Sequence, residues 1–333
     1  MAIKAQEPSF QEKVSPTELT STYCFYHEGD EDTLITNAPK PKRKKGQSKK
    51  EETESLIEAG TIAYFVHKPY VSFHSPPRTL RRGGSKGMQP ICLIQSSFFW
   101  KRWRLQFGDG IANAIDPRGV VGWWYRSNFD NTLDDEHAVK GYRVRSWRLW
   151  GESGKQYHRE VNAQRKEGVF CNANFSEHQP VRAEEAISLT WTSPFSTQTR
   201  WYRFGYAGVE LCWKGTRSLP DNRKWAKRLM PIHHLKLTAN SPGGKPGETV
   251  LAQFLCSPES GQCGSLLIFD SKVVKVIQNE KMLLHMDTKQ DSGNLLGKFH
   301  DIIIATAWCM ITGEYQKRKV AIELLFEMAL AGV

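Results

Sequence analysis

The chain has 333 residues, with 46 Lys and Arg against 35 Asp and Glu, which gives a formal net charge of +11. Apolar residues make up 39% of it, and no uninterrupted apolar run approaches the roughly 20 residues that cross a bilayer. This composition excludes a fully disordered chain and an integral membrane protein, and the length suffices for one large domain with tails or for two small domains.

The first 60 residues are polar and carry two opposed blocks of charge. Residues 1–38 have a net charge of −5, whereas residues 39–50 hold seven Lys or Arg and no acid. Because such blocks bury little surface, we predict a disordered tail over residues 1–60, whose deletion should leave the melting temperature nearly unchanged. Residues 1–13 lack the apolar core of a secretory signal, which favours a cytoplasmic or nuclear location.

Four consecutive cations of this tail form a candidate import signal, namely Lys42, Arg43, Lys44 and Lys45. Nuclear import receptors read such Pro-flanked basic runs, which also attract nucleic acid and anionic lipid. A solvated charge run with no partner is the competing interpretation. Since residues 51–333 still carry a net charge of +9, the body of the chain also favours an anionic partner.

The rest of the chain predicts a single domain over residues 61–333. A short apolar run at 61–66 is followed by a flexible loop at 75–90, rich in Pro, Gly and Arg. Later apolar and aromatic runs alternate with turn sequences and give about eleven strands, at residues 100–107, 111–115, 120–126, 141–150, 155–161, 187–192, 200–204, 209–213, 232–239, 249–256 and 264–269. Their close spacing leaves no room for crossover helices, so the sheet should be antiparallel.

The C-terminal part has helical spacing and predicts a helix over residues 299–331. The segment 302–311 is apolar on every face, so it should be buried all round inside the protein. Beyond Gly313 the pattern becomes amphipathic, with Glu323 and Glu327 on the polar side and Leu324 and Met328 on the apolar side. This half should lie on the surface of the core.

Together these elements predict an α+β fold that is mainly antiparallel β, with a curved sheet or closed barrel around a buried C-terminal helix. This arrangement resembles the barrel of tubby C-terminal domains, LURP-one-related proteins and phospholipid scramblases, over roughly residues 90–333. Several blocks also look like those of an uncharacterised family from filamentous fungi: Asp116-Pro117-Arg118-Gly119-Val120-Val121, residues 140–151, His234-Leu235-Lys236-Leu237 and residues 305–311. The tubby resemblance implies binding of phosphoinositide head groups by basic residues, but it assigns none of them here.

Ten of the eleven Trp lie between Trp100 and Trp225, and several alternate with cations. Guanidinium groups beside aromatic rings can bind phosphate while the rings stack on bases or reach lipid head groups. In the competing structural interpretation, Arg stems simply cover the rims of large core rings. The anion-binding candidates are Arg143, Arg145, Arg148, Lys101, Arg102 and Arg104.

No catalytic or metal-binding motif is complete in the sequence. The seven cysteines contain no C-x2-C pair and are expected to be reduced thiols. The segment 151–155 lacks the final Gly of a nucleophile elbow, and the glycine-rich segment 241–249 lacks the Gly-Lys-Ser/Thr of a P-loop. The sequence therefore predicts neither catalytic residues, nor a metal site, nor a cofactor.

We accordingly expect a non-catalytic intracellular binding module with a basic and aromatic surface. The leading hypothesis for its partner is phosphoinositide or another anionic membrane lipid. Two alternatives remain open: a nuclear protein that contacts nucleic acid or chromatin, and a protein-interaction scaffold whose charge serves solubility.

Overall fold

The structure, a computed structural model, describes residues 19–28, 32–39, 56, 59–69, 76–97, 102–115, 135–139, 155–156, 159–160, 163, 181–191, 201–215, 234–240, 248–256, 262–284 and 292–330. The strands in this part are β1 (Thr20–Glu28), β2 (Asp32–Thr36), β3 (Ile62–His67), β4 (Arg78–Arg82), β5 (Pro90–Ser96), β6 (Arg102–Phe107), β7 (Glu185–Trp191), β8 (Trp201–Tyr206), β9 (Val209–Gly215), β10 (His234–Asn240), β11 (Glu248–Cys256) and β12 (Gln262–Phe269). The helices are η2, a 3-10 helix (Asp109–Ala114), α3 (Asp270–Leu284) and α4 (Ser292–Leu330).

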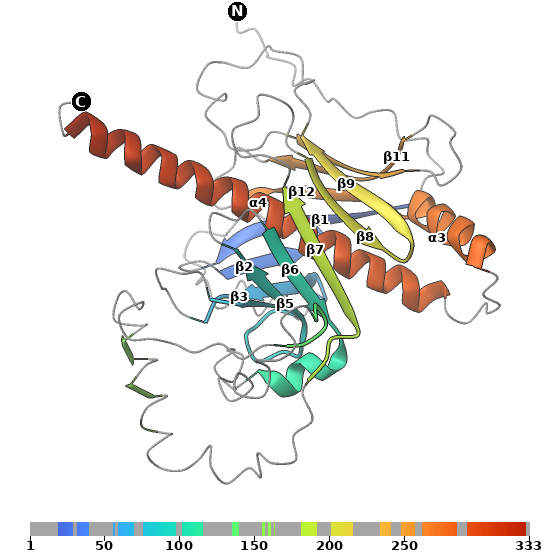
Figure 1. The fold of residues 1–333 in the computed structure, drawn as a ribbon, viewed down its shortest axis with the longest axis horizontal. Helices are drawn as coiled ribbons and strands as arrows, with labels where there is room; N and C mark the ends of the chain where they lie inside the picture. Colours follow the sequence, from blue (N-terminus) through green and yellow to red (C-terminus); the bar gives the residue numbers. More distant parts are fainter. Residues whose placement is uncertain are drawn as a thin grey trace, which may run out of the picture.

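The twelve strands form one closed antiparallel barrel, and α4 runs through it (Figure 1). Each strand pairs with its neighbours in the chain, and the barrel closes where β1 pairs with β12, from Thr20 opposite Phe269 to Tyr26 opposite Gln262. Closure leaves no strand with an unpaired edge within the barrel. The predicted fold class, a barrel around a buried C-terminal helix, is confirmed.

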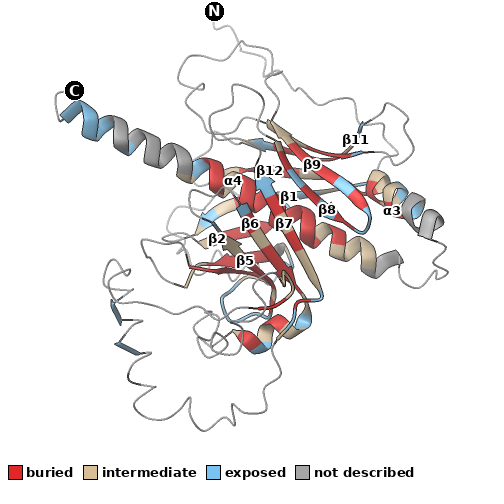
Figure 2. Cartoon of the chain, in the orientation of Figure 1, coloured by how far each residue is buried: buried red, intermediate tan, exposed pale blue. Residues whose placement is uncertain are grey.

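Side chains that point into the barrel fill it together with α4. On β8, for example, Tyr202, Phe204 and Tyr206 are buried, whereas Arg203 and Gly205 between them are exposed, as Figure 2 shows by the alternating colours of this strand. This period of two is the pattern expected of a strand with one face on a core. The burial also extends along α4, where every residue from Asp301 to Met310 is buried.

Side chains of α4 form hydrogen bonds with side chains of strands on several sides of the barrel. These bonds are Tyr64 Oη to Asp301 Oδ1 (2.8 Å), Trp213 Nε1 to Thr306 Oγ1 (3.0 Å), Trp308 Nε1 to Thr33 Oγ1 (3.0 Å) and Tyr202 Oη to Glu314 Oε1 (2.6 Å). We call the end of the barrel around Asp301 the inlet rim and the end around Glu314 the outlet rim. Because polar atoms buried in a core must be paired, these bonds fix the position of α4 along the barrel.

The length and composition of the segment Leu295–Gln316 of α4 would allow it to cross a membrane, with a mean hydropathy of 1.3 in its most apolar window. Of that window, 61% is buried inside the barrel. Such burial is typical of the core helix of a barrel.

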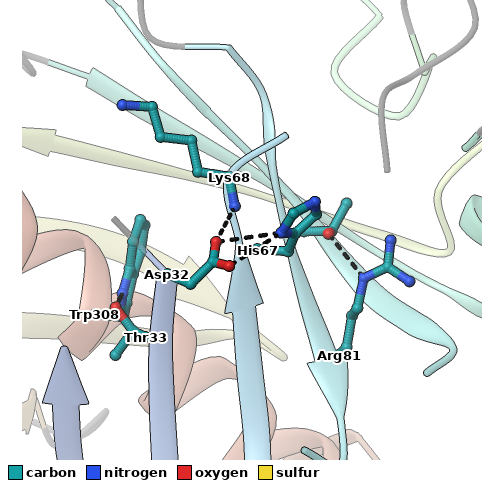
Figure 3. A network of polar contacts seen from close by, with 7 residues as sticks. Asp32, Thr33, His67, Lys68, Arg81 and Trp308 are labelled. Carbon is teal, nitrogen blue, oxygen red and sulfur yellow. Dashed lines mark hydrogen bonds and ion pairs between the residues drawn. The ribbon is translucent and has the colours of Figure 1, made fainter. Parts of the chain in front are cut away.

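The predicted disordered tail is wrong for residues 20–36, because β1 and β2 are two strands of the barrel. Figure 3 shows how β2 is tied in: the Asp32 carboxylate accepts a hydrogen bond from the backbone N–H of Lys68 (2.8 Å) and lies 3.2 Å from Nδ1 of His67. The next residue, Thr33, accepts the hydrogen bond from Trp308. The average polarity of residues 1–60 did not reveal these two strands, of nine and five residues, whose inward side chains are apolar or hydrogen-bonded. The expected domain boundary at residue 61 is therefore also wrong, whereas the basic cluster 42–45 lies outside the described residues.

The predicted flexible loop at 75–90 is wrong as well, since it contains β4. The Arg78 guanidinium of β4 lies 4.9 Å from the centre of the Trp308 ring inside the barrel, and burial lowers the pKa of Arg78 to about 10. Arg82, at the other end of β4, pairs with Asp301 of α4. This arginine-rich segment is thus a strand of the barrel, and two of its cations contact side chains of α4.

Further segments differ from their predicted structure. Residues 111–115 belong largely to η2 rather than to a strand, and the described residues between 155 and 163 are helical. The predicted strands at 120–126 and 141–150 lie outside the described residues. The C-terminal helix begins at Ser292, seven residues before its expected start, and α3 and β5 were not predicted.

Beyond the outlet rim, α4 continues to Leu330 and extends away from the barrel (Figure 1). Glu323 is exposed as expected, but Met328 is also 51% exposed, and the neighbouring Phe326 and Leu330 are 67% and 86% exposed. The prediction that Met328 packs on the core is wrong, because a helix of 39 residues is longer than the barrel that surrounds its middle.

Gly264 of β12 should tolerate no side chain. A Cβ there would lie 2.3 Å from the backbone oxygen of Leu255 and 2.4 Å from the Phe254 ring, and its φ of +155° is unusual for other residues. We expect Gly264→Ala to lower the free energy of unfolding by about 1–3 kcal/mol in urea titrations, as overpacking does. Gly205→Ala is the control, because no atom lies within 4 Å of a Cβ at Gly205. Equal effects of the two substitutions would contradict this account.

Candidate anion-binding surface

Five cations lie on the outward faces of neighbouring strands on one side of the barrel: Arg102 and Arg104 of β6, Arg203 of β8, Lys214 of β9 and Lys236 of β10. The inward neighbours of these residues fill the core, so the period of two places the cations outside. We call these five residues, together with Trp201 of β8, the basic wall. The order of the strands, β6 to β10, makes it continuous.

The register of the strands brings the members of the basic wall close together. Thr190 of β7 lies opposite both Arg102 and Arg203, and Lys214 lies opposite both Trp201 and Lys236. Since adjacent strands are about 4.8 Å apart, cations in one row lie within about 10 Å of each other along the backbone. This spacing allows one multiply charged anion to contact several of them.

Two of these cations lie close to the ring of Trp201. The guanidinium carbon of Arg203 lies 5.4 Å from the centre of this ring, and Nζ of Lys214 lies 4.8 Å from it. Cation–π contacts of this kind contribute about 0.5–1 kcal/mol at exposed sites. They hold both cations near the ring, so the indole orders this part of the basic wall.

Acidic side chains neutralise part of the basic wall. Arg102 pairs with Glu136 (2.5 Å) and also donates to Ser188, and Lys214 pairs with Glu248. In the part of the chain that the structure describes, no carboxylate pairs with the other three cations, Arg104, Arg203 and Lys236. These three supply the charge that remains available to an anion.

The structure places two of the six sequence candidates, Arg102 and Arg104, on the basic wall. Lys101 and the trio Arg143, Arg145 and Arg148 lie outside the described residues. Arg203 and Trp201 belong to a run in which cations and aromatic residues alternate, so the pattern itself carried the signal for them. Lys214 and Lys236 were missed, because only the register of β9 and β10 shows that two isolated lysines face the same patch.

Thiol and metal chemistry find little support in the described part of the chain. The six cysteines it contains are free thiols, and burial raises the pKa of Cys263 to about 12 and that of Cys92 and Cys309 well above the usual value. A thiol with a raised pKa holds little of the nucleophilic thiolate at neutral pH. Among the described residues, no group of three or more His, Cys, Asp or Glu side chains could hold a metal ion.

Comparison with known proteins identifies no relative: no family model, no curated protein and no solved structure matches this chain.

Proposed function

We propose that this protein is a non-catalytic binding module that attaches to anionic membrane lipid, with phosphoinositide as the preferred ligand, through the basic wall. The observation that carries the proposal is the group of three cations, Arg104, Arg203 and Lys236, to which no described carboxylate is paired. Each cation near an anionic membrane surface contributes about 1 kcal/mol of attraction. A barrel around a central helix is compatible with the resemblance to tubby-like barrels, for which binding of phosphoinositide head groups is implied.

One exposed apolar side chain near the cations favours lipid over nucleic acid. Leu255 of β11 lies opposite His234 on the outward face next to Lys236 and is 43% exposed. An exposed leucine among cations suits the boundary between head groups and acyl chains. By contrast, Arg203 and Lys214 lie within 5.4 Å of the centre of the Trp201 ring, so a base that stacked on this ring would compete with them for its surface.

The double variant Arg203→Gln/Lys236→Gln should bind anionic vesicles at least about tenfold more weakly than the wild type, since it removes two cations that no carboxylate of the described ranges neutralises. Cosedimentation of the full chain with phosphatidylcholine vesicles that contain phosphatidylinositol 4,5-bisphosphate measures this loss. Binding of the wild type should also weaken with rising salt. Vesicles of phosphatidylcholine alone should retain neither protein.

The matched control is Lys86→Gln/Lys275→Gln, which removes two exposed cations from outside the basic wall. Equal loss in both double variants would mean that net charge alone, and not the basic wall, attracts the vesicles. Tighter binding of the wild type to duplex DNA than to the vesicles would favour the nucleic-acid alternative. The same assay applied to Arg143→Gln/Arg145→Gln/Arg148→Gln tests the three candidates outside the described residues.

A further inference from the structure

A cavity of about 370 Å³ opens at the inlet rim, and the residues that line it are different from those of the basic wall. It lies between the rim ends of β4 to β8 and the part of α4 around Asp301. Its volume is within the range of small-molecule sites. Six charged side chains line it: Arg82, Asp109, Glu184, Glu185, Lys298 and Asp301.

Ion pairs cancel the positive charge of this cavity. Arg82 pairs with Asp301 at 2.7 Å, and Lys298 pairs with Glu184 at 3.2 Å. Two carboxylates remain, those of Asp109 and Glu185, and no cation forms an ion pair with either of them within the described residues. The cavity therefore carries a net charge of about −2, since each ionised carboxylate contributes one negative charge.

Tyr206 adds an uncharged polar group to the lining of this cavity. Its side chain is only 5% exposed and its ring packs against Phe299 at 4.9 Å. Burial and the negative charges of Glu185 and Asp301 raise the pKa of Tyr206 to about 12, so its hydroxyl is neutral. No residue of the described ranges forms a hydrogen bond with this hydroxyl, and because it is not sealed in the core it is open to a molecule in the cavity.

We propose that the inlet cavity binds a small organic cation, an ammonium or guanidinium compound, through the carboxylates of Asp109 and Glu185 and the hydroxyl of Tyr206. The N–H groups of the cation donate to these oxygens, and the neighbouring Phe107 and Tyr206 rings offer the aromatic surface that organic cations prefer. A metal ion suits the cavity less, because no three of the four carboxylates that line the cavity are close enough together to bind one metal ion. This site is independent of the basic wall, whose charge has the opposite sign.

Calorimetric titration of the full chain with agmatine and with spermidine tests the proposal. We expect saturable binding of one molecule per chain, at least about tenfold weaker in Asp109→Asn/Glu185→Gln, because two charged hydrogen-bond acceptors are lost. Tyr206→Phe, which keeps the ring, should weaken binding about three- to tenfold. Inorganic phosphate should not bind at this site.

The control Glu323→Gln/Glu327→Gln removes the same charge from exposed positions on α4 outside the barrel. If it weakened binding as much as the cavity variant, or if neither amine bound the wild type saturably, the proposal would be overturned. The blocked peptide acetyl-Gly-Arg-Gly-amide distinguishes two sources of the cation. Binding as tight as that of agmatine points to an arginine side chain of a protein, and much weaker binding points to a free amine.

Discussion

Replacing Ala307 by Asp should prevent the protein from folding. Ala307 is fully buried in the middle of α4, where strands surround the helix on every side. An unpaired carboxylate at this place loses its hydration and gains no partner, which costs several kcal/mol, comparable to the whole stability of a domain. Circular dichroism and gel filtration of the purified variant should show unfolded or aggregated protein.

Two further substitutions calibrate this result. Trp308→Ala should lower the free energy of unfolding by about 3–5 kcal/mol, because Trp308 packs on Trp103 and donates to Thr33. Glu323→Ala, exposed beyond the outlet rim, should change it by less than about 0.5 kcal/mol. A folded, soluble Ala307→Asp variant would mean that α4 has a free face and lies on an open sheet.

Deletion of residues 20–36 should abolish cooperative unfolding, although the composition of the N-terminal region suggested that it is dispensable. The deletion removes β1 and β2, which pair with β12 and β3, and so opens the barrel and uncovers α4. Thermal unfolding followed by circular dichroism should show no sharp transition.

Point substitutions in β1 test whether the loss of stability comes from lost side-chain packing, because they leave the length of the chain unchanged. Phe25→Ala should destabilise the protein by about 3–5 kcal/mol, since the Phe25 ring is fully buried and meets Phe254 edge-on at 5.9 Å. Thr22→Ala, on the exposed face of the same strand, should have little effect. A deletion variant that melted like the wild type would show that β3 and β12 can close the barrel without β1 and β2.

The strands and the helix that sequence analysis predicted correctly have buried side chains that are apolar or aromatic, so their burial is visible in the sequence itself. The segment 302–311 is apolar all round because strands surround it, and β8 to β12 follow apolar and aromatic runs that face this segment. The strands that were missed have a different chemistry. β4 directs Arg78 and Arg82 inward to a tryptophan ring and a carboxylate of α4, and such partners, more than 200 residues away, are invisible in the local pattern.

Only part of the candidate site could be predicted from the sequence. Arg104 could be selected because it stands beside Trp103 in a strand-like run. The basic wall as a whole depends on which strands are neighbours and on their register, and neither follows from composition. The inlet cavity was not predictable, because Asp109, Glu185 and Tyr206 come from three separate elements that meet only at the rim.

The position of α4 in the chain has a consequence for biosynthesis. All twelve strands leave the ribosome before the helix that fills their barrel, and the pairing of β1 with β12 must wait for most of the chain. At about 5–20 residues per second, the 39 residues of α4 take several seconds to synthesise. During this interval the apolar inner faces of the strands lack their partner, so we expect nascent chains that end before α4 to be held by chaperones rather than to fold.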